Sequence, residues 1–192
     1  EQPPEMTSLN LPESLGKILL LQEGLVLVTG PTGSGKSTTI ASIINEINKI
    51  KNLHIITLED PVEYMHTPNK CIINQREIGH DSETYSTALR AVLREDPDII
   101  LMGEIRDLES MEIALRAAET GHLVLATLHA NNANQAIDRI MHLVPESSQR
   151  QMLFDLSVNL KAIIAQQLIE TTTGGRRAAF DILVNTPTVA DC

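Results

Sequence analysis

The residues best suited to chemistry are three glycines, a lysine and a serine between positions 30 and 37. Gly30, Gly33, Gly35, Lys36 and Ser37 follow the spacing G-x-x-x-x-G-K-S. Glycine lacks a Cβ, so the backbone can bend around a dense anion with several N–H groups pointing inward. A lysine at this spacing reaches the outer phosphates, and the serine hydroxyl can bind Mg²⁺. The predicted nucleotide-binding residues are Gly30, Pro31, Thr32, Gly33, Ser34, Gly35, Lys36, Ser37 and Thr38.

A strand before this loop and a helix after it are needed to position it. Leu25 to Thr29 is apolar and partly β-branched, which is typical of a buried strand. From Ser37 onward, isoleucines recur at helical spacing, and Asn52 is expected to end the helix as a cap. The start of such a helix carries unpaired N–H groups and a dipole that favour negative charge. The local sequence therefore supports the interpretation as a phosphate loop.

A group of carboxylates follows the next apolar run. Leu53 to Leu58 is expected to be a buried strand, and it leads into Glu59, Asp60 and Glu63. Ligands of an open α/β sheet bind at the carboxyl ends of its strands. These acids can therefore hold hydrated Mg²⁺ or orient water. The alternative is a solvated acidic turn closed by Pro61, and the phosphate loop upstream favours the functional interpretation.

A second strand, expected from Ile99 to Met102, leads to Glu104. A buried strand that carries one carboxylate to Mg²⁺ and the attacking water is the second half of a nucleotide-hydrolysis site. Glu104 is therefore our first candidate for the general base and Glu63 the second, although the sequence alone does not order them. A purely structural alternative is that Glu104 caps the next turn. The predicted metal-facing residues are Ser37, Glu59, Asp60 and Glu104.

Two histidines bracket another apolar run, and both are candidate catalytic residues. The run from His122 to Leu128 is expected to be a strand, which puts His129 at its carboxyl edge. There a side chain can detect the γ-phosphate or relay hydrolysis to the next element, whereas a lone histidine is otherwise a structural hydrogen-bond donor. We assign that structural interpretation to the remaining histidines, which are His54, His66, His80 and His142.

Three arginines are candidate phosphate-sensing groups. Arg76 begins a polar loop expected to end at His80, and Arg90 and Arg94 lie one turn apart on a helix expected from Ser82 to Glu95. The guanidinium group is a planar cation with several donors, and it stabilises transferring phosphoryl groups. Most surface arginines only pair with an acid or face solvent, so this alternative stays open.

The remaining segments complete an α/β pattern. Gly121 is expected to end a helix that finishes at Thr120. The other expected elements are a short helix at 14–21, a hairpin arm at 69–75, helices at 135–143 and 148–169, a turn at 171–175 and a strand at 177–184.

Composition excludes several classes of protein. The 192 residues are 42% hydrophobic, which suits a single domain. A net charge of −10 gives no support for a sequence-independent grip on nucleic acid, so no nucleic-acid partner is expected. Cys71 and Cys192 do not make a disulfide framework, and we interpret both as ordinary thiols of a reducing compartment. Every apolar run is shorter than the roughly 18 residues of a membrane span, so no direct membrane insertion is expected.

Four blocks of this sequence resemble the motifs of the secretion ATPase superfamily, in the same order. They match its Walker A, aspartate-box, Walker B and histidine-box motifs, at Gly30 to Ser37, Glu59 to Glu63, Ile99 to Glu104, and Thr120 to His129. More narrowly, segments 93–98, 103–107, 117–122 and 127–136 resemble the PilT/PilU branch of type IV pilus motors, and PilU in particular.

The resemblance implies an α/β fold with a RecA-like P-loop NTPase core, whose mostly parallel sheet is flanked by helices. It implies ATP and Mg²⁺ as ligands, and assigns the histidine box to His122 and His129. Members of this branch form cytoplasmic homo-hexamers that hydrolyse ATP at subunit borders and drive pilus retraction and twitching motility. Their expected partners are a related pilus ATPase and an inner-membrane platform protein, through which the motor is peripheral to the inner membrane.

Family members carry a smaller PAS-like domain before the nucleotide loop, together with phosphate-facing arginines. We therefore expect residues 1–14 to be an interdomain linker and 15–192 to be the C-terminal ATPase domain. The first hypothesis is a pilus-retraction motor. The alternatives are a nucleotide-binding accessory module with little activity alone, and a motor for type II secretion or DNA uptake. The residues of the nucleotide site are expected to be the same in all of these motors, so they do not show whether the motor acts on a pilus, a secreted protein or DNA.

Overall fold

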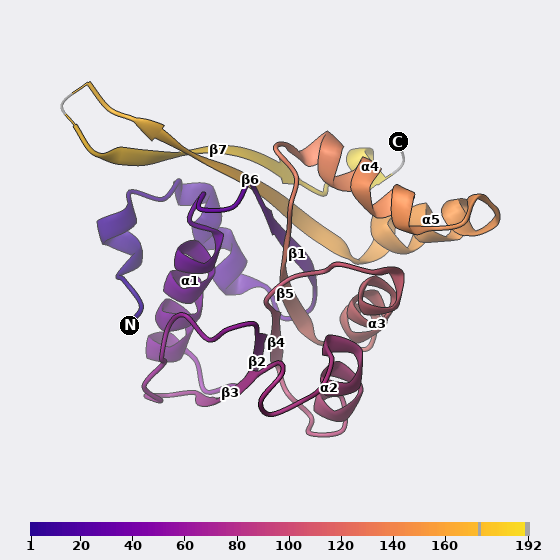
Figure 1. The fold of residues 1–192 in the computed structure, drawn as a ribbon, viewed down its shortest axis with the longest axis horizontal. Helices are drawn as coiled ribbons and strands as arrows, with labels where there is room; N and C mark the ends of the chain where they lie inside the picture. Colours follow the sequence, from indigo (N-terminus) through magenta and orange to yellow (C-terminus); the bar gives the residue numbers. More distant parts are fainter. Residues whose placement is uncertain (173, 191–192) are drawn as a thin grey trace.

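Seven strands form one sheet in the computed structural model, which describes residues 1–172 and 174–190. The strands are β1 (Gly24–Thr29), β2 (His54–Glu59), β3 (Ile72–Glu77), β4 (Ile99–Met102), β5 (Leu123–Leu128), β6 (Leu160–Glu170) and β7 (Arg176–Val184). Their order across the sheet is β3-β2-β4-β5-β1-β6-β7, and every neighbouring pair is parallel except β6 and β7. The predicted mostly parallel α/β sheet is therefore confirmed (Figure 1).

Helices cover both faces of this sheet. Figure 1 shows α1 (Lys36–Ile50) on one side of the strands, and α2 (Tyr85–Val92) and α3 (Leu108–Glu119) on the other. The other helices are α4 (Ala133–Leu143), α5 (Gln149–Asn159), α6 (Pro187–Ala190) and the 3₁₀ helices η1 (Met6–Leu9), η2 (Glu13–Leu20) and η3 (Glu146–Ser148). None of the helices in the described ranges is both long and apolar enough to cross a bilayer.

Burial on both faces explains why the central strands are continuous apolar runs. Every residue of β1, β4 and β5 is buried, because each strand has a strand on either side and a helical layer on both faces. Alternate side chains enter two separate cores, one under α1 and η2 and the other under α2 to α5. Each fully buried aliphatic side chain contributes about 1.5–3 kcal/mol, so the centre of the sheet is the most strongly held part of the fold.

The parallel pairing brings four strand ends to one edge of the sheet. In the register, Thr29 of β1 is opposite Leu128 of β5, and Met102 of β4 is opposite Leu58 of β2. The segments that follow these strands therefore start close together, although they are far apart in the sequence. This carboxyl edge is where ligands of open α/β sheets bind.

The prediction of a hairpin arm at 69–75 was wrong. β3 pairs with β2 in parallel, from His54 opposite Ile72 to Glu59 opposite Glu77, so the chain crosses back between the two strands. The strand also extends through Arg76, which had been expected to start a loop. An apolar run fixes the existence of a strand but not its direction, which depends on how long the connection is.

The prediction of one helix over 148–169 was also wrong. α5 ends at Asn159, and the chain continues as β6, which pairs in parallel with β1 and antiparallel with β7. Ile163 and Ile164 fit a helical pattern, but both are fully buried in the middle of β6. A short apolar run that is buried on both faces can look the same in either structure. Leu153, expected to face inward, is 49% exposed on α5.

Smaller differences concern the ends of elements. The α1 helix ends at Ile50 and Lys51 is its cap, so Asn52 does not end it. The helix expected from residue 82 to 95 is limited to α2, which Thr84 caps. The predicted turn at 171–175 includes Thr173, and the thiol interpretation included Cys192; both residues lie outside the described ranges. Cys71 is buried.

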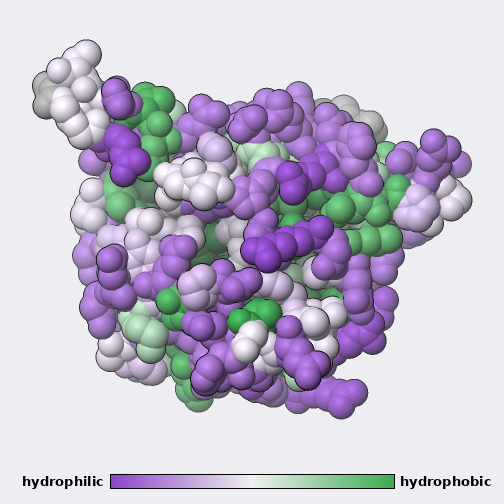
Figure 2. Space-filling model, viewed as in Figure 1, coloured by the Kyte–Doolittle hydropathy of each residue, from purple (hydrophilic) through white to green (hydrophobic). Residues whose placement is uncertain are grey.

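Several exposed apolar side chains lie on α5 and on the β6–β7 hairpin. Figure 2 shows hydrophobic surface beside α5 and near the β6–β7 hairpin. The exposed residues there are Leu153, Phe154 and Val158 on α5, and Ile169 and Val184 on the hairpin. Met65, in the acidic segment that follows β2, is also exposed, at 57%.

Candidate functional site

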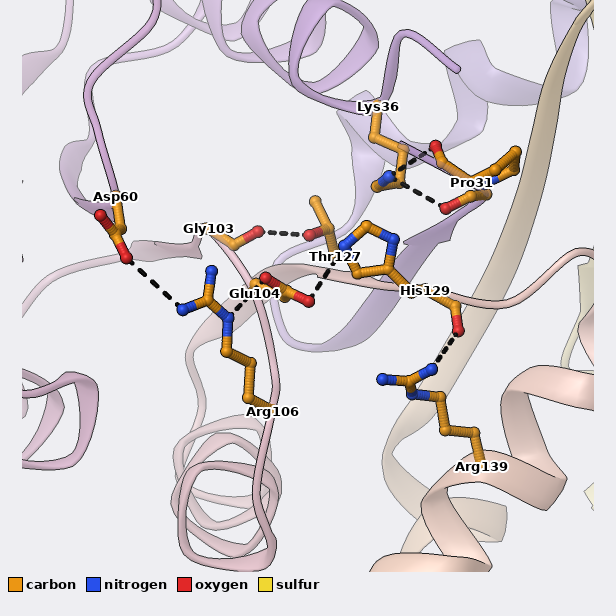
Figure 3. A network of polar contacts seen from close by, with 10 residues as sticks. Pro31, Lys36, Asp60, Gly103, Glu104, Arg106, Thr127, His129 and Arg139 are labelled. Carbon is orange, nitrogen blue, oxygen red and sulfur yellow. Dashed lines mark hydrogen bonds and ion pairs between the residues drawn. The ribbon is translucent and has the colours of Figure 1, made fainter. Parts of the chain in front are cut away.

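The loop between β1 and α1 curves around its own lysine. Gly33 and Gly35 have φ of 76° and 88°, in the left-handed region where a Cβ is unfavourable. The Lys36 ammonium donates hydrogen bonds to the carbonyls of Gly30 and Pro31, at 2.9 and 3.0 Å (Figure 3). Burial lowers the pKa of Lys36, while the charges of two nearby glutamates, Glu104 and Glu63, raise it. The cation therefore lies over the loop with carboxylates close by.

The segment after β2 is attached to both β3 and α1. Gln75 of β3 donates to the Glu59 carboxylate at 3.1 Å and to the carbonyl of Tyr64 at 2.8 Å. Thr57 also donates to Glu59, at 2.6 Å, and burial raises the pKa of that carboxyl. The hydroxyl of Tyr64 lies 2.9 Å from that of Thr38 in α1. These contacts hold the acidic segment against the start of the helix.

Glu63 differs from its neighbours because its carboxylate is not engaged. The side chain is exposed and forms no hydrogen bond or ion pair with another residue in the described ranges. It lines the same cavity as Lys36, whose pKa its charge raises. Glu63 is therefore free to accept a proton or a hydrogen bond from a molecule in that cavity.

Glu104 is held between a cation and a histidine. One carboxylate oxygen lies 3.0 Å from Nε2 of His129, and the other accepts a hydrogen bond of 2.6 Å from Nε of Arg106. Arg106 also approaches Asp60, at 3.5 Å (Figure 3). The Glu104 side chain is 15% exposed, whereas that of Arg106 is 56% exposed. The arginine thus links the acids that follow two different strands.

Backbone contacts fix the position of Glu104. Gly103 donates its N–H to the carbonyl of Leu58 at 2.7 Å, and its own carbonyl accepts a hydrogen bond from the Thr127 hydroxyl. A Cβ at Gly103 would lie 2.6 Å from the hydroxyl of Tyr85, so a larger residue there would have to displace that hydroxyl. Burial raises the pKa of Tyr85 to about 12, which keeps this hydroxyl neutral.

A cavity of about 270 Å³ lies between these segments. It brings together most of the residues predicted to bind the nucleotide, the metal or the attacking water. Those that line it are Thr32, Gly33, Lys36, Ser37, Glu59, Asp60, Glu63, Glu104 and His129. These residues were grouped from the sequence because they follow the carboxyl ends of strands, and in the structure they line one cavity.

His122 does not lie in this cavity. It precedes β5, at the opposite end of the strand from His129, and its Nδ1 lies 2.9 Å from the carbonyl of Ala117 at the end of α3. Six residues of extended strand separate the two histidines, which at about 3.3 Å per residue is a distance of roughly 20 Å. Within one chain, His122 therefore lies too far from Lys36 to act on the same ligand.

The three candidate phosphate-sensing arginines also lie outside the cavity. Arg76 forms hydrogen bonds of 2.7 and 2.9 Å with Glu95, and Arg90 one of 2.7 Å with Glu109. Arg94 is exposed and forms no ion pair within the described part of the chain. Two of the three therefore match the alternative of arginines that pair with surface acids.

Sequence reasoning missed several residues that line the cavity. Arg106 belongs to the segment 103–107 that carried the family resemblance, and this was the available signal. Tyr64 and Tyr85 also line the cavity, although aromatic residues at these positions have no motif to mark them.

The assignment of His66 as a structural hydrogen-bond donor, made together with three other histidines, was wrong. His66 lines the cavity, is 9% exposed, and its buried Nδ1 has no hydrogen-bond partner. Burial lowers the pKa of His66 to about 4. The other three have partners: His54 contacts Asn74, His80 contacts Asp81, and His142 contacts the carbonyl of Asp138.

The donors in this cavity suit a nucleotide and Mg²⁺. In the described ranges, no three His, Cys, Asp or Glu side chains are grouped so as to hold a metal by themselves. Mg²⁺ usually keeps several waters and shares one or two protein ligands with the phosphates of its substrate, so a hydroxyl from Ser37 and nearby acids are sufficient. The buried hydroxyl of Ser34 has no partner inside the loop. It is thus available as a donor to a phosphate oxygen.

A parallel sheet, a glycine-rich loop that opens a helix, and carboxylates at neighbouring strand ends define a P-loop NTPase fold. The chain belongs to the family described as "Type II/IV secretion system protein", whose model matches residues 6–186.

Comparison with individual proteins gives a consistent result. The chain is 52% identical to the type IV pilus ATPase PilU of Pseudomonas aeruginosa and 48% identical to the retraction ATPase PilT of the same organism. These matches cover 98% and 96% of this chain, and 50% and 54% of the relatives. A crystal structure of the pilus retraction motor PilT with bound ADP superposes with a TM-score of 0.96 at 50% identity, over 99% of this chain and 55% of that one. The chain thus spans about half the length of these relatives.

Proposed function

We propose that this chain is the nucleotide-hydrolysing domain of an ATP-driven motor that retracts a type IV pilus. The observation that carries the proposal is that Lys36 and Ser37 of the phosphate loop line one cavity with Glu63 and Glu104. The similarity to the type IV pilus ATPases PilU and PilT supports a pilus as the structure that the motor moves. The bound ADP in the PilT structure supports an adenine nucleotide as the ligand.

The two glutamates have contacts that suit different tasks. Both oxygens of Glu104 are engaged by His129 and Arg106, which fixes the carboxylate in place. The carboxylate of Glu63 is unpaired within the described ranges and is close enough to Lys36 to raise its pKa. We therefore assign proton acceptance from the attacking water to Glu63 and an orienting role, facing the metal, to Glu104.

The remaining residues bind and orient. Lys36 exchanges its carbonyl partners for phosphate oxygens, and Ser37, with Glu59 and Asp60 nearby, holds Mg²⁺ directly or through water. When bound, Mg²⁺ neutralises charge on the phosphoryl oxygens. His129 holds one Glu104 oxygen, so a change in the phosphates can be transmitted to α4 through the segment that follows β5.

The proposed motor is a ring of identical subunits that works with other proteins at the inner membrane. A homo-hexameric ring would let a neighbouring subunit supply cationic groups to the cavity, which in this chain opens to solvent around Arg106. The partners are a related pilus ATPase and an inner-membrane platform protein, which hold the cytoplasmic motor at the membrane.

The direct test is Mg²⁺-dependent ATP hydrolysis by the chain and by Lys36→Ala. We expect the variant to lose ADP binding and turnover, because the only ammonium within the loop is removed. Lys51→Ala is the matched control, since Lys51 lies at the other end of α1 and its ammonium donates to the carbonyl of Leu21. Equal turnover by Lys36→Ala and wild type would refute the proposed site.

Measuring ATP hydrolysis at a series of protein concentrations tests whether assembly into a ring is needed for activity. Specific activity should rise with protein concentration as subunits assemble, whereas retention of ADP should follow the occupancy of single sites. Hydrolysis with a specific activity independent of concentration would contradict a site that is completed by a neighbour.

A further inference from the structure

We infer that Gln166 of β6 is a positioning residue for the phosphate loop, which it holds in the shape that receives the phosphates of a nucleotide. The inference rests on the proposed function and concerns the same site. Gln166 lies in the part of the sheet that the sequence pattern assigned to a helix, and it is separated from the loop by more than a hundred residues along the chain.

The side-chain amide of Gln166 joins two parts of the loop. Its Nε2 donates to the carbonyl of Ser34 at 2.7 Å, and its Oε1 accepts from the Thr39 hydroxyl in the first turns of α1 at 2.7 Å. Gln166 is 3% exposed and Thr39 1% exposed, so water does not compete for these bonds. A buried amide with both ends satisfied specifies one arrangement of the groups that it bridges.

The loop also approaches Gln166 closely at two of its glycines. A Cβ on Gly30 would lie 2.3 Å from the Gln166 carbonyl oxygen, and a Cβ on Gly35 would lie 2.8 Å from its Nε2. A side chain at Gly30 or Gly35 would therefore clash with Gln166, whether or not a ligand is bound. The phosphate loop is thus pressed against β6 at both ends.

The contact with Ser34 determines where the next N–H points. In a trans peptide, the C=O and N–H groups point in opposite directions. Because the Ser34 carbonyl points to the Gln166 side chain, the N–H of Gly35 points away from that side chain. Loss of the bond would let this peptide rotate, and one of the donors that receive a phosphate would be misdirected.

The neighbouring residue provides a matched control. Gln167 is the same residue type on the same strand but is exposed, with its side chain on the other face of β6. Gln166→Met keeps the length of the side chain and removes both hydrogen bonds, and Gln167→Met makes the same change on the surface. We expect ADP affinity, measured by calorimetry, to fall about tenfold in Gln166→Met, because buried polar groups are left unpaired. Affinity should stay within twofold of wild type in Gln167→Met.

Thr39 tests the other end of the bridge. Thr39→Val removes the hydroxyl and keeps the shape, and we expect a smaller loss of about threefold because the Ser34 contact remains. Thr39→Ser keeps the hydroxyl and should restore wild-type affinity. In steady-state assays the loss in both damaging variants should appear mainly in KM, with kcat within about threefold, because the acids are untouched.

The outcomes separate the inference from the proposed function. If wild type fails to bind ADP, the proposed site is wrong and the inference falls with it. If wild type binds ADP and Gln166→Met binds it equally well, only the inference is overturned. Should Gln166→Met not fold, as judged by its thermal transition without nucleotide, Thr39→Val against Thr39→Ser decides: equal affinities overturn the inference, and weaker binding by the valine variant supports it.

Discussion

The two histidines that bracket β5 lie at opposite edges of the same sheet and have different surroundings. His129 follows the strand, and its Nε2 lies 3.0 Å from the Glu104 carboxylate in the cavity. His122 precedes the strand, and it contacts the carbonyl of Ala117, where α3 ends. The two residues are of the same type and flank the same strand. Their different surroundings therefore come from the edge of the sheet at which each one lies.

The two edges also differ in how their polar groups are satisfied. At the amino edge, Asp98 accepts the N–H of His54 at 2.7 Å, and the carbonyl of His122 accepts the N–H of Gly24 at 3.0 Å. At the carboxyl edge, the Ser34 hydroxyl and Nδ1 of His66 are buried without partners. Unmet hydrogen-bonding capacity in a fold is expected where a ligand supplies the missing partners. Within the described residues, three of the four such atoms, on Thr29, Ser34 and His66, lie at the carboxyl edge, and the fourth is the Ser42 hydroxyl inside α1.

The largest expected effect is on kcat, and it compares Glu63 at the carboxyl edge with Glu119 near the amino edge. Glu63→Gln should lower kcat for ATP hydrolysis by about 100-fold or more while ADP affinity stays near wild type, because the amide cannot accept the proton of water. Glu119→Gln, an exposed acid at the end of α3 near the amino edge, should leave both unchanged. A Glu63→Gln variant with wild-type kcat would end the assignment of the base and leave Glu104 as the candidate.

The second effect concerns the stability cost of burying His66 at the carboxyl edge. Its pKa is lowered to about 4 in the folded protein, against roughly 6.5 in the unfolded chain. The unfolded chain therefore takes up a proton first as the pH falls. The unfolding free energy should decrease by about 2 kcal/mol between pH 7 and pH 5 from this residue alone.

Chemical denaturation at a series of pH values measures this contribution. His66→Phe keeps an aromatic ring without a titrating group, so its unfolding free energy should change less than that of wild type between pH 7 and pH 5. His80→Phe is the control, because His80 is exposed and paired with Asp81, which raises its pKa instead. Parallel curves for wild type and His66→Phe would show that the histidine is not buried as described.

The sequence predicted the half of the sheet that carries the motifs. β1, β2, β4 and β5 are mainly buried apolar runs, and each was expected within about a residue of its observed ends. The carboxyl-edge rule then grouped Lys36 with the acids, because strand order does not need to be known when all strands run the same way.

The sequence did not predict features that depend on partners distant in the chain. The residues of β6 satisfied a helical spacing, and only the neighbouring β1 and β7 distinguish a strand from a helix there. Gln166 and Tyr64 act through contacts with the phosphate loop and α1 that no local pattern encodes. His122 was placed with His129 because both flank one strand, although the strand itself separates them.

The smallest effect compares these two histidines directly. His129→Asn should lower kcat about fivefold, because Glu104 loses one of the two groups that orient its carboxylate, worth about 1 kcal/mol. His122→Asn should leave kcat unchanged and instead lower the unfolding free energy by about 0.5–1 kcal/mol, since its contact at the end of α3 is lost. Equal losses of kcat in the two variants would mean that His122 reaches a nucleotide through a neighbouring subunit. The difference between the two edges would then hold within one chain but not within the assembled ring.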